Sequence, residues 1–432
     1  MIKRDFYLNQ LIYKRHSSKV KIITGLRRSG KSYLLSHLYK DFLLKDGVKN
    51  EQIIIIELDD EINDDLLKKG KLREYVEKKA PDENTQYYIF IDEIQLAEDF
   101  VRAVNSLNKH PNYDIYITGS NSKFLSKDIN DQFKDRGTEI NVRPLSYSEF
   151  YEAYAKDKRF AMQDYLKYGG MPGLFEEETD FAKEKYLNNL MEKVYVDDIR
   201  KNINTYLVDE LSATVDALCS LTGNLVNPLN MANYLSTTRR IKIDHETISR
   251  FFEGITDAFL FEQVKRFDIK GKTYLKSRSK YYCQDIGLRN VRLNFREQNQ
   301  GFLIENVIYN ELVTRGYRVD VGFINQRRKK DNKYQFAQLE VDFVARKLSK
   351  EYYIQIMNDL PNGKHLENKY TALIKVPGSF KKIIVINKPL ISYTNELGIL
   401  IISLEEFLLN LNSLDLWEKI IYASLKKYCN LV

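Results

Sequence analysis

The stretch Gly25-Leu26-Arg27-Arg28-Ser29-Gly30-Lys31-Ser32 matches the phosphate-loop pattern G-x-x-x-x-G-K-[ST] at every fixed position. An apolar run, Val20–Thr24, precedes it, and a helix-like stretch, Tyr33–Leu38, follows it. This context predicts that backbone amides and a helix N-terminus cradle phosphate groups, with Lys31 at the β- and γ-phosphates and the Ser32 hydroxyl on Mg²⁺. The expected nucleotide-binding residues are Gly25, Leu26, Arg27, Arg28, Ser29, Gly30, Lys31, Ser32 and Tyr33. An accidental glycine-rich turn is the alternative interpretation.

A second apolar run, Tyr87–Ile91, ends in the carboxylates of Asp92 and Glu93. Continuous apolar character is typical of a parallel strand buried on both faces, and ligands bind at the carboxyl ends of such strands. We expect Asp92 to hold Mg²⁺ together with Ser32. We expect Glu93 to be the catalytic base that polarises the water attacking the γ-phosphate. A core strand followed by a solvated acidic turn is the alternative.

The composition predicts a cytoplasmic protein. The 432 residues suffice for two to four domains of roughly 100–200 residues each. No apolar run approaches the roughly 20 residues that cross a bilayer, and the segment Met1–Phe6 lacks the apolar core of a secretion signal. Cys219, Cys283 and Cys429 form no metal-spaced pair, and the five histidines form no zinc motif. We therefore expect a reducing compartment and no membrane contact.

The net charge is modest but unevenly distributed. Lys and Arg exceed Asp and Glu by 67 − 60 = +7 over the chain, whereas residues 262–333 hold 17 against 8, an excess of +9. Aromatic residues are interleaved with these cations, namely Phe267, Tyr274, Tyr281, Tyr282 and Phe295. Such a region could neutralise nucleic-acid phosphates, and a solvated strand-and-loop surface is the alternative. DNA or a protein is the expected partner of this region.

Five apolar segments alternate with helical stretches in the first 150 residues. They are Lys21–Thr24, Gln52–Leu58, Tyr87–Ile91, Ile115–Thr118 and Glu139–Val142. This alternation is typical of a parallel sheet with helices on both faces. The predicted fold class is therefore α/β, with a P-loop NTPase domain over residues 1–150.

Helical patterning dominates after residue 150, and Gly169-Gly170-Met171-Pro172 marks a turn within it. We expect a helical lid over residues 151–210. Beyond the lid, Leu229–Leu235 and a stretch beginning at the predicted N-cap Asp244 are expected helices.

Two strands, Phe259–Phe267 and Lys272–Lys276, are expected to flank a hairpin turn at residues 268–271. Helix, turn, helix and hairpin in that order predict a winged-helix-like domain over residues 211–295. Such domains dock to protein or to DNA, so the order of elements does not choose between the two partners.

The last third predicts a second α/β unit over residues 296–390, followed by a helical tail over residues 391–432. A helix, Phe302–Thr314, precedes strands at Glu340–Ala345, Tyr352–Met357 and Lys382–Ile386. The charged segment Gln326–Asp331 is expected to form a mobile loop between helix and sheet.

Several short motifs follow one another along the chain. They are Gly25–Ser32, Ile91–Gln95, Thr118–Ser122, Pro144–Ser146, Gly169–Pro172, Lys280–Arg289, Glu340–Ala345 and Tyr353–Gln355. This order resembles that of bacterial and archaeal AAA-type ATPases that carry an uncharacterised, DUF4143-like C-terminal region of restriction-endonuclease-like fold. The resemblance implies ATP as the nucleotide and homo-oligomers as an expected state.

The resemblance also assigns roles to three further residues. Ser120 or Asn121 matches the polar sensor of the γ-phosphate, and a polar turn after a strand is the alternative. Arg136 matches the arginine that reaches a neighbouring subunit's γ-phosphate. Here Asp135-Arg136-Gly137 replaces the usual Gly-Arg order, so a surface salt bridge is the alternative. Arg27 and Arg28 could instead act within their own subunit.

A two-carboxylate-plus-lysine nuclease site would use Asp342, Gln355 on the next strand and Glu305 on the preceding helix. Position 357, where such a site needs lysine, is Met357, which can neither carry charge nor activate water. Glu340 flanks Asp342, so weak metal binding stays open. The missing cation nevertheless predicts a degenerate fold used for binding.

The leading hypothesis is Mg²⁺-dependent ATP binding and hydrolysis, coupled to rearrangement of the C-terminal domains on DNA or a protein partner. A nucleotide-gated switch with little turnover is a second class. An ATP-controlled nuclease is a third.

Overall fold

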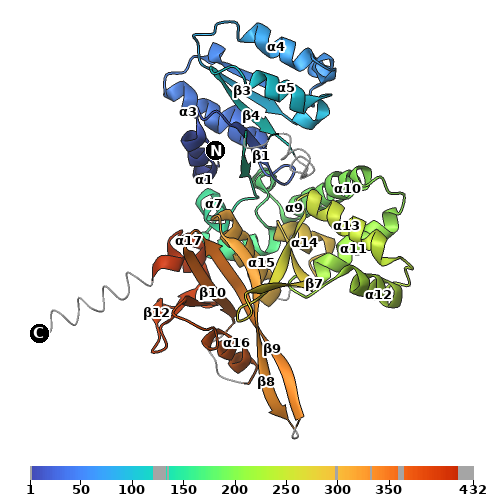
Figure 1. Cartoon of the computed structure of the whole chain (residues 1–432), viewed down its shortest axis with the longest axis vertical. Coiled ribbons are helices and arrows are strands. Elements are labelled where there is room, and N and C mark those ends of the chain that lie inside the picture. Colours follow the sequence, from blue (N-terminus) through green and yellow to red (C-terminus); the bar gives the residue numbers. More distant parts are fainter. Residues whose placement is uncertain are drawn as a thin grey trace, which may run out of the picture.

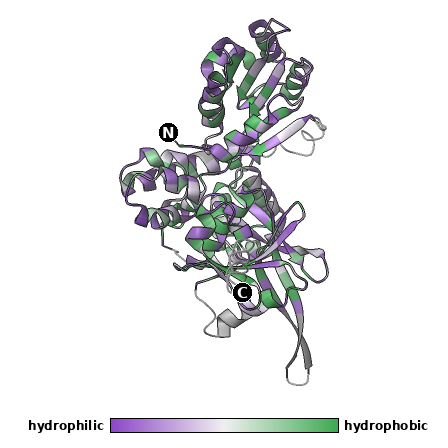
Figure 2. Ribbon diagram, turned by 90° about the vertical axis from the view of Figure 1, so that its left-hand side faces the viewer, coloured by the Kyte–Doolittle hydropathy of each residue, from purple (hydrophilic) through white to green (hydrophobic). Residues whose placement is uncertain are grey.

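A computed structural model describes residues 2–119, 133, 136–296, 300–330, 333–358 and 364–416. Two sheets with their helices make up most of this part of the chain (Figure 1). Strands at the centre of each sheet are mainly hydrophobic, whereas the outer helices carry hydrophilic stretches (Figure 2). In the described residues every helix is too short or too polar to cross a membrane.

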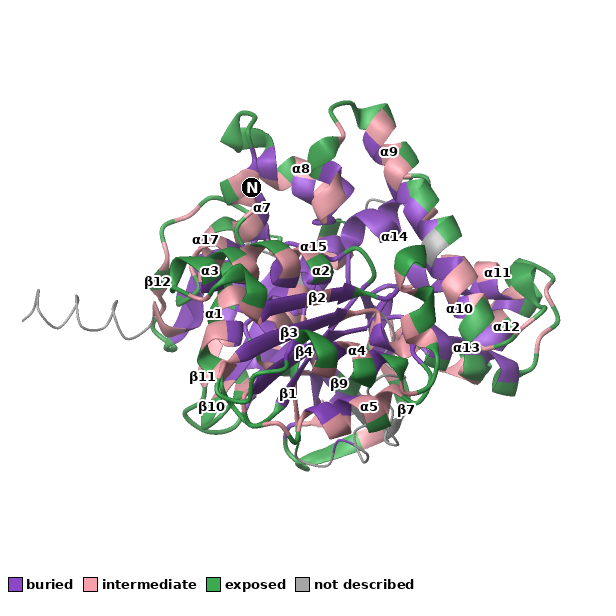
Figure 3. Cartoon of the chain, turned by 90° about the horizontal axis from the view of Figure 1, so that it is seen from above, coloured by how far each residue is buried: buried purple, intermediate pink, exposed green. Residues whose placement is uncertain are grey.

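The first sheet is parallel, with strand order β2-β3-β4-β1-β5. Its strands are β1 (Val20–Thr24), β2 (Ile53–Glu57), β3 (Tyr87–Asp92), β4 (Tyr113–Thr118) and β5 (Gly137–Asn141). The five predicted strands are therefore confirmed, with small shifts of their ends. Seen from above, the central strands β1, β3 and β4 are buried among the surrounding helices (Figure 3).

Alternate side chains of the strands face opposite helical layers, as a pleated strand requires. Ile22 and Ile89 belong to a core that contains helices α4 (Lys71–Lys79) and α5 (Phe100–Leu107). Their neighbours Ile23 and Tyr88 pack into a second core instead. That core contains α1 (Asp5–Lys14) and the helix that runs through α2 (Lys31–Tyr33), η1 (Leu34–Tyr39) and α3 (Lys40–Lys45).

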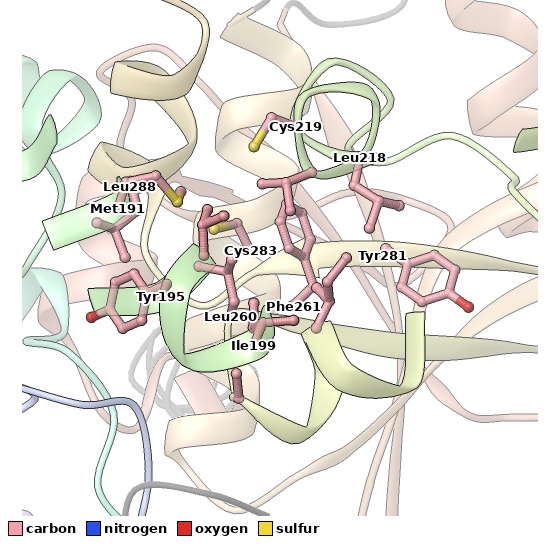
Figure 4. Close-up of a cluster of buried hydrophobic side chains, with 14 of the residues drawn as sticks. Met191, Tyr195, Ile199, Leu218, Cys219, Leu260, Phe261, Tyr281, Cys283 and Leu288 are labelled. Atoms are coloured by element: carbon pink, nitrogen blue, oxygen red, sulfur yellow. The ribbon is translucent and has the colours of Figure 1, made fainter. Parts of the chain in front are cut away.

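Helices follow the first sheet, as the sequence predicts. They are α7 (Tyr147–Ala153), α8 (Ala161–Tyr168), α9 (Asp180–Asn189), η8 (Leu190–Val196), α10 (Asp197–Asn202), α11 (Val208–Ser220), α12 (Pro228–Thr238), α13 (His245–Asp257), α14 (Ile286–Arg292) and α15 (Gln300–Thr314). Asp244 caps α13 as expected, because its carboxylate accepts from Thr247 N at 2.8 Å. Met191, Leu218, Phe261 and other apolar residues of this region form one buried cluster (Figure 4).

The second sheet is mixed, with strand order β12-β13-β11-β10-β9-β8-β6-β7. Its strands are β6 (Phe261–Asp268), β7 (Thr273–Cys283), β8 (Arg318–Lys330), β9 (Lys333–Lys347), β10 (Lys350–Met357), β11 (Lys381–Ile386), β12 (Tyr393–Thr394) and β13 (Ile399–Ser403). Helices α15 and α17 (Leu404–Leu409) contribute to the core on one face, and α16 (Lys364–Ile374) contributes to the core on the other.

Three expectations need correction. The β6–β7 hairpin pairs with β8, so the boundary predicted at residue 296 divides strands of one sheet. Residues 326–330 continue β8 instead of forming a loop, because they pair with β9 across a long hairpin. Residues 391–403 supply β12 and β13, so the C-terminal segment is not purely helical, and residues 417–432 lie outside the described part.

Asp285 fastens the Gly169–Gly170 turn to the N-terminus of α14. Its carboxylate accepts from Gly170 N at 2.7 Å, Gly287 N at 2.9 Å and Leu288 N at 3.1 Å. A Cβ atom on Gly169, where φ is +77°, would lie 2.2 Å from Asp285 Oδ1. Burial raises the pKa of Asp285 to about 6, although the three amides oppose that rise.

This raised pKa gives the protein a predicted pH-dependent stability. The unfolded Asp has a pKa of about 3.9, so between that value and about 6 the folded state keeps a proton that the unfolded state loses. The stabilisation is complete below the lower pKa and is lost as pH rises through the upper one.

We therefore expect the free energy of unfolding of the wild type, relative to Asp285→Asn, to be about 1.4 kcal/mol greater at pH 5.0 than at pH 7.5. Urea denaturation of both proteins, followed by circular dichroism at the two pH values, measures this difference. Parallel pH profiles for the two proteins would contradict the assignment.

Candidate functional site

The phosphate-loop sequence connects β1 to α2 at the carboxyl edge of the first sheet. Gly25 has φ +131°, and a Cβ atom there would lie 2.1 Å from the carbonyl oxygen of Val142. Gly30 has φ +96° and precedes the first residue of α2. Both glycines of the pattern are thus required by the backbone, which favours close wrapping of the loop.

Lys31 is 4 % exposed, and its ammonium donates to Gly25 O and Leu26 O at 3.1 Å each. Burial lowers the pKa of Lys31 to about 8, while Glu93 and Asp92 raise it. The loop therefore holds its cation beside the two carboxylates that end β3, which is the juxtaposition the sequence predicts.

Asp92 connects the loop to the neighbouring strands. The Ser32 hydroxyl donates to Asp92 Oδ2 at 2.6 Å, and the hydroxyl of Thr118, at the end of β4, donates to Asp92 Oδ1. The hydroxyl and carboxylate oxygens of Ser32 and Asp92 are the donor types that Mg²⁺ prefers, so these residues fit a magnesium site. Thr118 is absent from the predicted set, because only the pairing of β3 with β4 brings it to Asp92.

Glu93 is held in an uncommon conformation at this edge. Its φ of +48° is left-handed, and its backbone amide donates to Thr118 Oγ1 at 3.0 Å. The side-chain amide of Gln95 donates to the Glu93 carboxylate. Non-glycine residues with positive φ are often found at functional sites, where the strain is offset elsewhere. Gln95 lies within the recognised Ile91–Gln95 motif, yet the sequence gives it no separate role.

The remaining loop residues fasten the loop to two other parts of the chain. Leu26 is buried in the apolar cluster of the helical region, and Ser29 Oγ donates to Val142 O at 2.8 Å. Arg27 forms an ion pair with Asp198 of α10 at 2.7 Å, and its carbonyl accepts from the Tyr195 hydroxyl at 2.8 Å.

The contacts described for Arg28 and Tyr33 are with residues other than Asp92 and Glu93. Arg28 has φ +61° and, with Tyr186 and Lys193, lines a pocket of about 550 Å³. Tyr33 stacks on His37 at a centroid distance of 4.9 Å.

Arg136 lies at the opposite edge of the sheet from the loop. Val20 pairs with Gly137 at the start of β1 and β5, and Thr24 pairs with Asn141 at their ends. Six residues at about 3.3 Å each place Arg136 on the order of 20 Å from Gly25. Arg136 therefore cannot reach the phosphate loop of its own chain. Ser120 and Asn121 lie outside the described residues.

The residues of the predicted nuclease site also come together, but each carboxylate is paired. Lys280 Nζ lies 2.9 Å from Glu305 Oε1 and 2.7 Å from Glu340 Oε1. Burial opposes its charge, but these two carboxylates raise the pKa of Lys280 above its ordinary value.

Asp342 has its own cation, because Lys369 of α16 lies 2.9 Å from Asp342 Oδ2. The cation that Met357 cannot supply thus comes from another element. Gln355 is fully buried, and neither its amide oxygen nor its amide nitrogen has a hydrogen-bond partner within the described part of the chain. No group of three His, Cys, Asp or Glu side chains placed to hold a metal occurs among the described residues.

The sheet is parallel, a glycine-rich loop that contains Lys31 follows β1, and two carboxylates lie at the end of β3. These features together define a P-loop nucleotide-binding protein. Comparison with known proteins agrees with this class. The AAA domain family matches residues 17–151, and a domain of unknown function, DUF8612, matches residues 159–299. The chain belongs to the AAA-type P-loop ATPase family.

The chain is 33 % identical over 393 residues to an uncharacterised protein of Haemophilus influenzae, covering 90 % of this chain and 94 % of that one. It is 28 % identical over 395 residues to an uncharacterised protein of Methanocaldococcus jannaschii, covering 88 % and 83 % respectively.

Solved structures resemble the chain only distantly. Cdc6p from Pyrobaculum aerophilum aligns with a TM-score of 0.30 at 9 % identity, covering 71 % of this chain and 94 % of that one. The Aeropyrum pernix Orc1 protein, solved in complex with DNA, aligns with a TM-score of 0.29 at 10 % identity, covering 68 % and 93 %. The DUF8612 match crosses the boundary predicted at residue 210, and the DUF4143-like assignment stays a prediction.

The contacts of Thr118 generate a prediction. We expect Thr118→Val to weaken Mg²⁺-dependent ATP binding about tenfold, since a lost hydrogen bond to a charged group is worth about 1.5 kcal/mol or more. Thr118→Ser keeps the hydroxyl and should restore most of the affinity. Titration calorimetry with and without Mg²⁺ measures the effect, and equal affinities for the valine and serine variants would contradict it.

Proposed function

We propose that the protein binds ATP with Mg²⁺ at the phosphate loop, hydrolyses it, and transmits the change to its helical and C-terminal regions. The observation that carries this proposal is the 2.6 Å hydrogen bond between Ser32 and Asp92 beside the buried ammonium of Lys31. Three groups from two segments meet there with the chemistry that a metal-bound triphosphate needs. Membership of the AAA-type family supports nucleotide use.

In this proposal each residue has a distinct task. Ser32 and Asp92 would hold Mg²⁺, whose charge would offset the negative charge of the phosphates. Lys31 exchanges the loop carbonyls for phosphate oxygens. Glu93 accepts a proton from the attacking water, and Gln95 orients its carboxylate. Because burial lowers the pKa of Lys31, the negative charge of bound phosphates would raise that pKa again.

The attachment of the loop to the helical region supports coupling between ATP binding and the rest of the chain. Arg27 contacts Tyr195 and Asp198, so a shift of the loop backbone acts on η8 and α10 directly. We propose residues 151–210 as a lid on this basis.

We propose that α11, α12 and α13, together with the β6–β7 hairpin, are winged-helix-like. Three helices precede the β6–β7 hairpin, and Val226, in the link between α11 and α12, forms a bridge to Ser279 of β7. Helix α13 exposes Glu246 and Glu253 together with Arg250, so its surface charge does not choose between a protein partner and DNA.

In this proposal Arg136 acts on the nucleotide of a neighbouring copy and not on that of its own chain, and Ser120 or Asn121 acts as the γ-phosphate sensor. The position of Arg136 at the far edge of the sheet supports a role in trans over one in cis. The second sheet, with α15 and α16, would form a degenerate restriction-endonuclease-like domain that binds and does not cut.

Substitutions at the carboxylates and the lysine distinguish turnover from a switch. We expect Glu93→Gln to retain ATP binding while turnover falls by about 10²–10⁴-fold, because a general base is lost. Asp92→Asn should impair Mg²⁺-dependent turnover, and Lys31→Ala should abolish binding. Calorimetry and steady-state phosphate release measure the two effects. Wild-type phosphate release equal to that of Lys31→Ala would favour the nucleotide-gated switch.

The paired carboxylates of the C-terminal cluster generate a further prediction. Because Lys280 and Lys369 occupy Glu305, Glu340 and Asp342, we expect no cleavage of plasmid DNA in the presence of Mg²⁺ and ATP. Agarose gel electrophoresis after incubation with the full chain measures cutting. Cleavage that is abolished by Asp342→Ala would show instead that Lys369 serves as the catalytic cation.

A further inference from the structure

A groove of about 1160 Å³ lies along α4 and α5, which are side by side at the outer end of the ATPase domain (Figures 1 and 3). Five basic side chains line it, namely Lys69, Arg73, Arg102, Lys109 and Arg136, against one carboxylate, Asp99. None of the phosphate-loop residues lines this groove, so it is separate from the proposed ATP site.

The positive charge of the groove is only partly balanced. Asp99 pairs with Lys69 at 2.9 Å, and Arg73 lies 3.7 Å from Glu77. Within the described part of the chain, Arg102, Lys109 and Arg136 form no ion pair, and all three are exposed. Three cations on a concave surface attract anions more strongly than isolated surface lysines do, because their potentials add.

The backbone adds to this positive potential. Helix α4 begins after Gly70 and α5 begins after Asp99, and no side chain caps either N-terminus. Gly70 and Asp99 both line the groove, so the partial positive charges of two helix N-termini lie beside the five cations.

The groove is long enough for several phosphates in a row. Its lining follows α5 from Asp99, before the first turn, to Lys109, after the last. At 1.5 Å per residue this path is roughly 15 Å, which corresponds to about four nucleotides of one strand at 3.4 Å each. A single triphosphate from a neighbouring copy would occupy only part of it. Three of the five cations are arginines, whose planar forks match phosphate oxygens.

We propose that the groove between α4 and α5 binds the phosphate backbone of a nucleic acid. This inference does not depend on ATP hydrolysis. It also places the contact on the ATPase domain instead of on residues 262–333. In that region four cations, Arg266, Lys280, Arg289 and Arg315, are buried, and so are four carboxylates, Asp285, Glu305, Glu311 and Asp320.

The test is a titration of a fluorescein-labelled 20-nucleotide single strand, and of the corresponding duplex, with the full-length protein. Fluorescence anisotropy at 50–200 mM NaCl compares the wild type with the double variant Arg102→Glu, Lys109→Glu. We expect the affinity of the groove variant to fall at least tenfold, and its logarithmic salt slope on the single strand to decrease by about 1.4, because two phosphate contacts are lost.

A matched control is the double variant Lys270→Glu, Lys272→Glu, which makes the same change of charge at exposed positions of the β6–β7 turn. It should bind as the wild type does, and both variants should keep wild-type circular dichroism and ATP turnover. If the wild type itself showed no ATP turnover, that result would contradict the proposed function but would leave this inference unchanged.

Three results would overturn the inference. The first is equal binding by the wild type and the groove variant, or no binding by either. The second is a loss of affinity in the Lys270/Lys272 variant alone, which would move the contact to the hairpin. The third is unchanged DNA binding together with loss of ATP-dependent self-association in the groove variant, measured by sedimentation velocity, which would make a second copy of the chain the occupant.

Discussion

Arg143 joins the two halves of the chain through an ion pair in which the arginine is buried. Its guanidinium is 3 % exposed and donates to Glu262 Oε1 at 2.6 Å and to Asn310 Oδ1 at 2.9 Å. Arg143 follows β5 of the first sheet, whereas Glu262 belongs to β6 of the second. Burial opposes ionisation of Glu262, yet Arg143, Tyr309 and Gln284 together lower its pKa. Since leaving one such charge unpaired costs about 3–5 kcal/mol, the two sheets are constrained to keep this contact.

The phosphate loop is connected to the same ion pair through a second buried arginine. Arg4 donates to Ser29 O at 3.0 Å and to Arg143 O at 2.6 Å, and its Nε lies 3.0 Å from Glu149. A nucleotide that moves the Ser29 backbone therefore acts on Arg4 and on the segment that carries Arg143. A further contact, that of Arg27 with Tyr195, joins the same edge of the sheet to the helices. Contacts thus connect the loop to the helical region and to the second sheet. These contacts are the physical basis of the proposed coupling.

Local signals made the first sheet and its loop predictable from the sequence. The apolar runs that form β1 and β3 are short, bounded by turns and followed by residues with one dominant use at that place, Lys31 and Asp92. Thr118 and Lys369 had no such signal, because their partners Asp92 and Asp342 are 26 and 27 residues away and strand pairing or helix docking brings them together. The prediction of a loop near residue 326, within β8, was wrong because a local signal was present but did not decide the structure. The charged composition of this segment is typical of a loop, but pairing with β9 satisfies its backbone whatever its side chains are.

The charge counted along the sequence differs from the charge exposed on the surface of the folded chain. A run of cations in sequence says little about potential when some of them are internal, as Lys280 is between Glu305 and Glu340. Conversely, Arg102 and Arg136 are separated in the chain by β4 and by residues outside the described part, yet they line one groove. The field that a partner meets depends on which cations lack a nearby carboxylate, and that property follows from packing. The exposed cations beside α5 therefore form a candidate anion site that a charge count along the sequence does not show.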